Sequence, residues 1–335
     1  MLRGEKMPTM KDVAREAGVS LGTVSKVING IAVGEVYRLR VEAASERLGY
    51  EVNSYARGLK TNKTGAVALI LPSIRHPFFA ALADALTAAL MRADRRPLLM
   101  ITNYDPEAER KCFTMVRQNK VDGIVALSYT EGMEIDRSIP FVSIDRYFDS
   151  GVPCVASDNF GGGRLAAERL CACGARRLLF LRIGASVPCA VDERQKGFES
   201  ACREQGLPCE SLSLRNEEGE EPIFRFLDAR FTAEKPEFDG IFCNTDYLAV
   251  QVRDYLERRG VRVPEQVQIV GFDGLVDFPT KRYYCSTVVQ PVEEMAESAL
   301  SLLLREDRSA LPERVTLPVR YAPGGTTREP VSLPR

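Results

Sequence analysis

Polar and aromatic residues follow several apolar runs of the chain, at the points where predicted strands end. The set comprises His76, Phe78, Phe79, Asp145, Arg146, Arg194, Thr245, Asp246, Asp273 and Gln290. Carboxylates and arginines can form paired hydrogen bonds with hydroxyl groups, and aromatic ring faces can cover the C–H face of a sugar. We therefore expect these side chains to converge on one cleft that binds a small polar molecule.

The strands that would position this cleft begin at residue 65. From there, apolar segments such as Ala66–Leu71 and Gly240–Cys243 alternate with amphipathic helical segments such as Phe78–Ala93. This alternation predicts an α/β fold of doubly wound parallel sheets, and about nine strands are too many for one sheet of usual size, which favours two lobes. Ligands bind beyond the carboxyl ends of strands in such sheets, where the polar residues fall.

Alternative interpretations apply to four of these residues. His76 can equally be a ligand donor or an ordinary loop residue. Asp246 is as well suited to capping the helix that follows it as to contacting a ligand. Phe78 and Phe79 can equally be core residues. The prediction of a binding cleft therefore rests on the whole set lying at one edge of the sheets.

The sequence offers no usual set of catalytic groups. It contains one histidine, His76, no P-loop and no arrangement typical of a catalytic triad. Gly161-Gly162-Gly163 lacks the spacing of a dinucleotide-binding loop and predicts close backbone packing at a helix start. Cys171 and Cys173 would face different sides of a helix, which makes them a poor metal clip. We expect no catalytic residue, no metal site and no cofactor.

The first 50 residues predict three short helices. Thr9 opens a helical run that Gly18 ends, Ser20 can cap the next helix, and a third helix is expected from about Glu35 to Leu48. Two helices joined by such a short turn form a helix-turn-helix pattern, although a helical hairpin without a ligand has the same pattern.

A polar segment, residues 51–64, separates these helices from the α/β region and has the composition of a linker. Its one large aliphatic side chain, Leu59, has no apolar neighbours to bury it. Residues 1–64 carry a net charge of +4, whereas the whole chain carries −1. A basic segment attached to an acidic body suggests that the N-terminal part meets an anion.

A set of motifs extends along the chain: Thr9–Ser20, Thr23–Gly30, Leu48–Tyr50, Asn53, Ala56–Leu59, His76–Phe79, Asp145-Arg146, Val263-Pro264, Val270–Asp273 and Gln290-Pro291. With these motifs the chain resembles the LacI/GalR family of bacterial transcription regulators. The resemblance covers nearly the whole chain. It implies a helix-turn-helix headpiece (1–50), a hinge that folds on DNA (51–64) and an effector-binding and dimerisation core (65–335). The core would resemble periplasmic sugar-binding proteins, with lobe 1 at about 65–162 plus 291–322 and lobe 2 at about 163–290 plus 323–335.

The resemblance also implies a set of DNA contacts. The second helix would enter the major groove and present Leu21, Gly22 and Lys26 to the bases, and Lys26 can donate to guanine. In the hinge, Leu59 would wedge into a central minor-groove step while Arg57 and Lys60 line the groove. Further contacts, mostly to phosphates, are implied for Thr9, Met10, Ser20, Thr23, Ser25, Asn29, Tyr50, Asn53 and Ala56.

The partners implied are a near-palindromic double-stranded operator, a second copy of the chain and a small effector. A homodimer is expected, with a tetramer left open. A monosaccharide or small glycoside is favoured as the effector, a purine or nucleoside is the alternative, and a ligand-independent architectural DNA-binding protein is the alternative from another class. Without an apolar N-terminal stretch or membrane-spanning run, the expected location is the cytoplasm, associated with the nucleoid.

Three departures from the family pattern concern the effector. Thr245 stands where sugar-binding members often have asparagine, and Gly324 stands where arginine is typical. The segment Asn216–Glu221 is acidic and lacks the aromatic residue often found there. Because these positions bear on effector recognition, the sequence leaves the effector unidentified.

Overall fold

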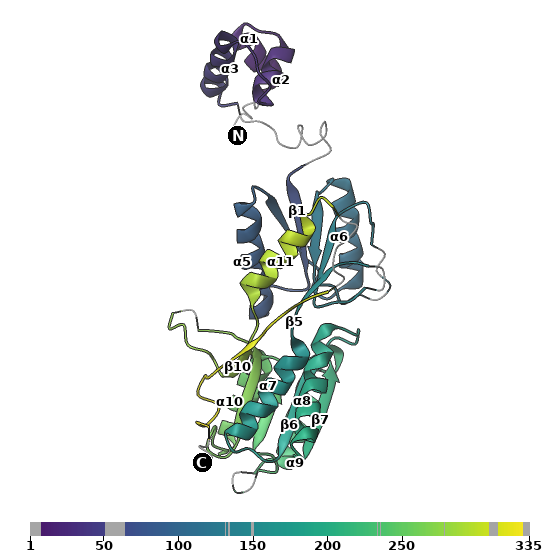
Figure 1. Cartoon of the computed structure of the whole chain (residues 1–335), viewed down its shortest axis with the longest axis vertical. Coiled ribbons are helices and arrows are strands. Elements are labelled where there is room, and N and C mark those ends of the chain that lie inside the picture. Colours follow the sequence, from purple (N-terminus) through teal and green to yellow (C-terminus); the bar gives the residue numbers. More distant parts are fainter. Residues whose placement is uncertain are drawn as a thin grey trace, which may run out of the picture. The chain divides into compact units, whose positions relative to one another are not determined.

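The computed structural model describes residues 8–50, 64–130, 132, 135–148, 151–232, 234, 236–277, 279–307 and 314–330. The chain divides into two compact units, Met1–Thr64 and Gly65–Arg335 (Figure 1). Within the described residues, no helix has the length and apolar character needed to cross a membrane.

The first unit is a bundle of three helices, α1 (Met10–Ala17), α2 (Leu21–Ile28) and α3 (Glu35–Leu48). Its small core consists of Val13, Ala14, Ala17, Val24, Val41 and Ala44. Gly18 ends α1 in the left-handed region, at a φ of 61°, which glycine adopts without a steric penalty. The three helices expected from the sequence are therefore present.

Local hydrogen bonds define where α1 and α2 begin. The carboxylate of Asp12 accepts from the backbone nitrogen and the hydroxyl of Thr9, at 2.9 and 2.6 Å. The hydroxyl oxygen of Ser20 accepts from the backbone nitrogen of Thr23 at 3.1 Å. These contacts satisfy backbone donors that a helix start otherwise leaves unpaired.

Lobe 1 of the second unit contains a six-stranded parallel sheet in the order β11-β5-β4-β3-β1-β2. Its strands are β1 (Ala66–Leu71), β2 (Arg96–Ile101), β3 (Gly123–Ala126), β4 (Phe141–Ile144), β5 (Cys154–Ser157) and β11 (Arg314–Leu317). Helices α5 (Pro77–Arg92) and α11 (Val292–Leu303) cover one face, and α6 (Pro106–Gln118) covers the other.

Strand β1 shows why this sheet is buried on both sides. Val67, Leu69 and Leu71 pack with residues of α5 and α11, whereas Ala66, Ala68 and Ile70 pack with residues of α6. A continuous apolar run is what a strand needs when helices cover both faces of a parallel sheet.

Lobe 2 repeats this architecture with the strand order β12-β10-β9-β8-β6-β7. Its strands are β6 (Leu178–Gly184), β7 (Cys209–Arg215), β8 (Gly240–Cys243), β9 (Gln268–Asp273), β10 (Ser286–Val289) and β12 (Arg320–Ala322). Its helices are α7 (Asn159–Ala172), α8 (Glu193–Glu204), α9 (Glu221–Arg230) and α10 (Asp246–Arg258), with short 3₁₀ turns at Ala190–Asp192 and Asn216–Glu218. The edge strand β12 runs antiparallel to β10, and the other described pairs are parallel.

The described chain passes between the lobes from β5 to α7, from β10 to α11 and from β11 to β12. Two of these crossings fall earlier than the expected boundaries. Helix α7 begins at Asn159 rather than near residue 163, and β12 already belongs to lobe 2 although residues up to 322 were expected in lobe 1. Asp158 caps α7 by accepting from the backbone nitrogen of Gly161, so the glycine triplet lies near the start of the helix.

Candidate functional site

A cavity of about 250 Å³ is lined by residues of both lobes of the second unit. Lobe 1 contributes residues that follow β1, β2, β3 and β4, and lobe 2 contributes residues at or beyond the ends of β6, β7, β8 and β9. The cavity therefore lies at the carboxyl edges of both sheets, as expected for doubly wound folds.

Eight of the ten residues expected at this cleft line the cavity. They are His76, Phe78, Phe79, Asp145, Arg194, Thr245, Asp273 and Gln290. Phe78 and Phe79 are also nearly fully buried members of the lobe 1 core, so both are core residues that line the cavity. Thr245 has a second role as well, because its hydroxyl accepts from the backbone nitrogen of Leu248 and caps α10.

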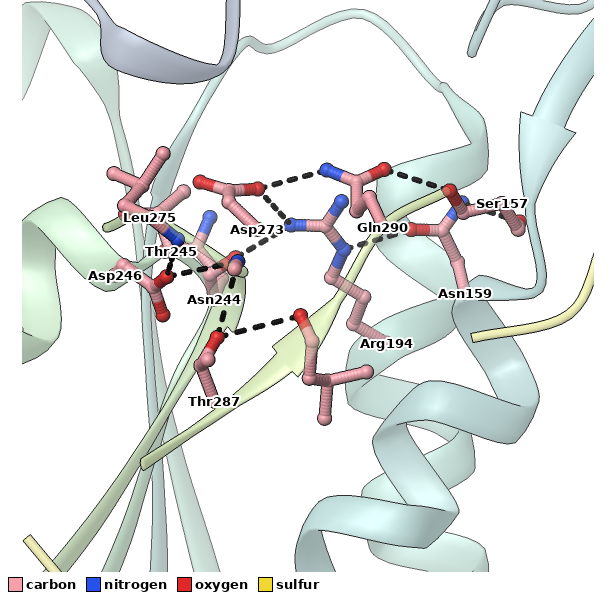
Figure 2. A network of polar contacts seen from close by, with 12 residues as sticks. Ser157, Asn159, Arg194, Asn244, Thr245, Asp246, Asp273, Leu275, Thr287 and Gln290 are labelled. Atoms are coloured by element: carbon pink, nitrogen blue, oxygen red, sulfur yellow. Dashed lines mark hydrogen bonds and ion pairs between the residues drawn. The ribbon is translucent and has the colours of Figure 1, made fainter. Parts of the chain in front are cut away.

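Two expected residues, Arg146 and Asp246, are outside the lining of the cavity. One carboxylate oxygen of Asp246 accepts from the backbone nitrogens of Gly274 and Leu275, at 2.9 and 2.7 Å (Figure 2). This buried carboxylate fixes the loop after β9. Arg146 is buried in lobe 1 and donates to the carbonyl of Ser128 at 3.3 Å.

Arg194 is the centre of a polar network at the floor of the cavity (Figure 2). Its Nε donates to Oδ1 of Asn159 at 2.7 Å, and its Nη1 donates to the carbonyl of Asn244 at 2.5 Å. The same Nη1 lies 3.8 Å from Oδ1 of Asp273, and the guanidinium carbon lies 3.5 Å above the ring of Phe272. Contacts on several sides fix the orientation of this buried cation.

Gln290 connects this network to lobe 1. Its Nε2 donates to Oδ1 of Asp273 in lobe 2, and its Oε1 accepts from the hydroxyl of Ser157 at the end of β5, both at 2.8 Å. The amide of Asn159 donates to the carbonyl of Ser157 at 3.0 Å. Ser157 and Gln290 flank crossings between the lobes, so this network lies against the segments that connect them.

Glycines allow the close approach of helices that positions Arg194. A Cβ atom at Gly163 would lie 2.0 Å from the carbonyl oxygen of Arg194, and one at Gly197 would lie 2.0 Å from that of Phe160. Helices α7 and α8 can therefore touch through their backbones. The expectation that the glycine triplet serves close packing is confirmed at Gly163.

Burial perturbs the titration of the cavity's ionisable groups. It raises the pKa of Asp145 to about 6, although the nearby Arg194 opposes the shift. It also raises the pKa of Asp273 well above its ordinary value, again against Arg194. The pKa of His76 falls to about 4 because burial disfavours the imidazolium, and the charge of Arg194 adds to this. The site therefore contains a neutral imidazole at pH 7.

Several buried polar atoms at the cavity lack partners among the described residues. They include Nδ1 of His76, Oδ1 of Asp145 and Oδ2 of Asp273. Asp145 and Asp273 also have positive φ angles, 53° and 131°, which are uncommon for residues other than glycine. Strained backbone and unpaired buried atoms together are typical of a binding site, where a ligand supplies the missing hydrogen bonds.

The sequence interpretation missed other residues of the lining. Tyr104 and Tyr129, which follow β2 and β3, stack with ring centroids 6.1 Å apart. Their position after strands was a signal that could have identified them. The further polar or aromatic lining residues are Arg182, Cys189, Asn216, Glu220, Asn244, Tyr247 and Gln251. Asn216 and Glu220 belong to the acidic segment Asn216–Glu221, which departs from the family pattern.

The helix-turn-helix unit presents α2 as a partly exposed helix. Leu21 is 45% exposed, and Gly22 and Lys26 are exposed, so all three expected base-reading residues are accessible within this unit. The amide of Asn29 donates to the carbonyl of Ser25 at 2.7 Å, which closes the end of the helix.

The remaining expected DNA contacts differ in their surroundings. Thr9 and Ser20 are exposed at the starts of α1 and α2, and Thr23 is partly buried behind Ser20. Met10 and Tyr50 are partly buried against the small core of the unit, so both also support its packing. The expected hinge contacts lie outside the described residues, namely Asn53, Ala56, Arg57, Leu59 and Lys60.

Comparisons with known proteins agree with both units. Residues 9–53 match the model of the bacterial regulatory proteins of the lacI family. Residues 64–303 match the model of the periplasmic binding proteins and sugar-binding domain of the LacI family. The second match alone spans more than half of the chain.

Individual relatives extend over nearly the whole chain. A sucrose operon repressor from Pediococcus pentosaceus is 31% identical over 325 residues, covering 95% of this chain and 99% of its own. A ribose operon repressor from Halalkalibacterium halodurans is 32% identical over 308 residues, covering 90% of each chain. A solved complex of the transcriptional regulator CelR with cellobiose is 26% identical, has a TM-score of 0.64 and covers 95% of this chain and 99% of its own.

These matches confirm the resemblance inferred from the N-terminal run and from the strand ends. Members of this family regulate transcription and are not enzymes, which agrees with the lack of a catalytic set in the sequence. The chain belongs to the LacI family of bacterial regulatory proteins.

Proposed function

We propose that the protein is a transcriptional repressor that binds a near-palindromic operator as a homodimer and responds to a sugar. The observation that carries this proposal is the combination within one chain of an exposed helix α2 and a cavity with unpaired buried polar atoms. The first feature suits the major groove of DNA, and the second suits a ligand rich in hydroxyl groups. A regulator of this kind acts in the cytoplasm, where its operator is.

On the DNA side, Lys26 is the residue proposed to read a base. It is exposed on α2, and lysine can donate to the acceptors of guanine in the major groove. Leu21 offers only an apolar contact, for instance to a thymine methyl group, and Gly22 offers no side chain. Direct reading of bases by α2 is therefore limited, and we infer that DNA shape contributes to specificity. Two copies would read the two half-sites of the operator.

On the effector side, the arrangement of donors and acceptors favours a sugar. Asp145 and Asp273 are acceptors, Arg194 is a donor, and His76 and Gln290 surround the same cavity. The relatives named above are repressors of sucrose and ribose operons, and the CelR complex contains cellobiose. By occupying the cavity, a sugar would contact both lobes and change their relative orientation, which couples the cavity to the hinge and the operator.

The test begins with selection of operators from a random-sequence DNA library by the full-length protein. We expect near-palindromic sequences to be enriched. Fluorescence anisotropy on the selected operator then measures affinity with and without pentoses, hexoses, disaccharides and purines. A change of about fivefold or more caused by a sugar is expected for allosteric coupling.

Two matched variants identify the cavity as the origin of the response. Asp145→Asn removes a buried carboxylate from the lining, and Asp84→Asn removes an exposed carboxylate on α5. The sugar response should be lost in the first variant and kept in the second. Failure to enrich any sequence would refute specific DNA binding, and indifference of operator affinity to every metabolite would favour the architectural alternative. A response to purines alone would replace the sugar by the purine alternative.

A further inference from the structure

The cavity extends along the sheet edge of lobe 2, well beyond Asp273. Its lining includes Asp273 at the end of β9, Asn244 after β8, Gly184 at the end of β6 and Asn216 after β7. In the order β9-β8-β6-β7 these strands are successive neighbours, so the lining spans three strand spacings, or roughly 14 Å. One pyranose ring with its hydroxyls measures on the order of 7 Å from its bond lengths. A monosaccharide at β9 therefore leaves the β6–β7 end unfilled.

Arg182 supplies a fixed donor at this second end. Its Nη2 donates to Oδ1 of Asp192 at 2.7 Å and to the carbonyl of Ala185 at 3.2 Å. Its side chain is only 11% exposed, and its Nε has no partner among the described residues. A Cβ atom at Gly184 would lie 2.8 Å from Nη2, so the lack of a side chain there makes room for the guanidinium.

Gln251 supplies a fixed acceptor at the same end. Its Nε2 donates to Oε2 of Glu220 at 2.7 Å, which orients the amide and leaves Oε1 without a partner among the described residues. Tyr247 lies one turn earlier on α10, on the same side of the helix, and also lines the cavity. A donor, an acceptor and an aromatic ring are the elements that recognise a sugar ring.

We propose that Arg182, Asn216, Glu220, Tyr247 and Gln251 form a distal subsite that binds the second ring of a neutral disaccharide or glycoside. The first ring then occupies the β9 end of the cavity. This inference rests on the proposed function and makes it more specific, because it identifies the effector as a two-unit carbohydrate rather than a monosaccharide.

Charges at the distal subsite favour a neutral second unit over a phosphorylated one. The positive charge of Arg182 is offset by Asp192, its partner at 2.7 Å. The carboxylate of Glu220 lines the same part of the cavity and would repel a phosphate dianion. Hydroxyl groups, in contrast, can accept from Nε of Arg182 and donate to Oε1 of Gln251 without bringing a net charge into the site.

Isothermal titration calorimetry on the full-length wild-type protein tests the proposal. The ligands are sucrose, maltose, cellobiose, lactose and trehalose, then their components glucose, fructose and galactose, then sucrose 6-phosphate and trehalose 6-phosphate. We expect one neutral disaccharide to bind at least tenfold more tightly than each of its components and than any phosphorylated sugar. A component that binds as tightly as its disaccharides, or a phosphorylated sugar that binds most tightly, would overturn the subsite but leave a sugar effector. Absence of binding to every carbohydrate would overturn both proposals.

Variants of the distal subsite test the position of the second ring independently of the affinities measured for the wild-type protein. Gln251→Leu removes the unpartnered acceptor, and Gln118→Leu makes the same change at an exposed position of α6 outside the cavity. In Gln251→Leu the ratio of disaccharide to component affinity should fall about tenfold, and in Gln118→Leu it should stay as in wild type. Arg182→Met removes the Nε donor and should lower the ratio as well. An unchanged ratio in both cavity variants, with melting temperatures showing that they are folded, would refute the assignment.

Discussion

Asp145→Asn should stabilise the empty protein while it abolishes the response to the effector. Asp145 is 3% exposed, and one of its carboxylate oxygens has no partner among the described residues. Burial raises its pKa from 3.8 to about 6, so keeping it ionised at neutral pH costs free energy in the folded state. Asparagine has nearly the same shape and no charge, and removes this cost.

The size of the effect follows from the shift in pKa. A shift of two units corresponds to about 3 kcal/mol at most, and part of this cost remains because the amide is also polar. The unfolded state releases its proton near pH 4 and the folded state near pH 6, so wild type loses stability between these values and no further above them. The variant should therefore equal wild type below pH 4 and exceed it by about 1–3 kcal/mol above pH 6.5.

Thermal unfolding at a series of pH values measures this difference directly. For a unit of this size, the expected gain at pH 7.5 is roughly 2–6 °C in the melting temperature. Asp84→Asn, which removes an exposed carboxylate, is the control and should leave the melting temperature at pH 7.5 as in wild type. A decrease in melting temperature for Asp145→Asn at pH 7.5, or a difference that does not change between pH 4 and pH 7, would refute the argument.

Three further variants test other parts of the structure. Gly163→Ala places a Cβ atom against the carbonyl of Arg194 and should lower the free energy of unfolding by about 1–3 kcal/mol. Urea unfolding measures this change, and an unchanged midpoint would contradict the close packing of α7 and α8. Lys26→Ala should relax base preference at one symmetric position of each half-site by about 1–3 kcal/mol, and an identical selection profile would argue against base reading. Leu59→Ala should weaken operator binding about tenfold without changing the melting temperature or effector affinity, and equal operator affinity would exclude the wedge.

The strand-end rule explains how much of the site the sequence could predict. Residues directly after a buried strand must lie at its carboxyl edge, whatever the details of packing, so Asp145, Asp273 and Gln290 could be placed at one cleft. The same rule extends to Tyr104 and Tyr129, which follow the apolar runs of β2 and β3. The sequence therefore contains the signal for these two tyrosines as well.

The placement of residues away from the strand ends depends on tertiary packing, which local sequence patterns do not encode. Gln251 lies more than one turn into α10, and Glu220 lies in an acidic loop. The sequence gives no signal that their side chains meet. Asp246 shows the opposite case, a residue near a strand end that does not line the cavity. It lies just beyond the end of β8, but its carboxylate accepts hydrogen bonds from the backbone of the loop after β9. The local sequence gives no sign of that competing interaction.

The polar groups that hold Arg194 suggest how an occupant of the cavity affects both lobes. Asn159 lies at the crossing into α7, and Gln290 lies at the crossing into α11; both are buried and hydrogen-bonded within the network. Asp145 on lobe 1 and Asp273 on lobe 2 each have a carboxylate oxygen without a partner among the described residues. A ligand that donates to both carboxylates binds most tightly when the lobes are oriented so that both carboxylates reach it. Its binding free energy therefore favours one relative orientation of the lobes, and that differential affinity is what allosteric control requires.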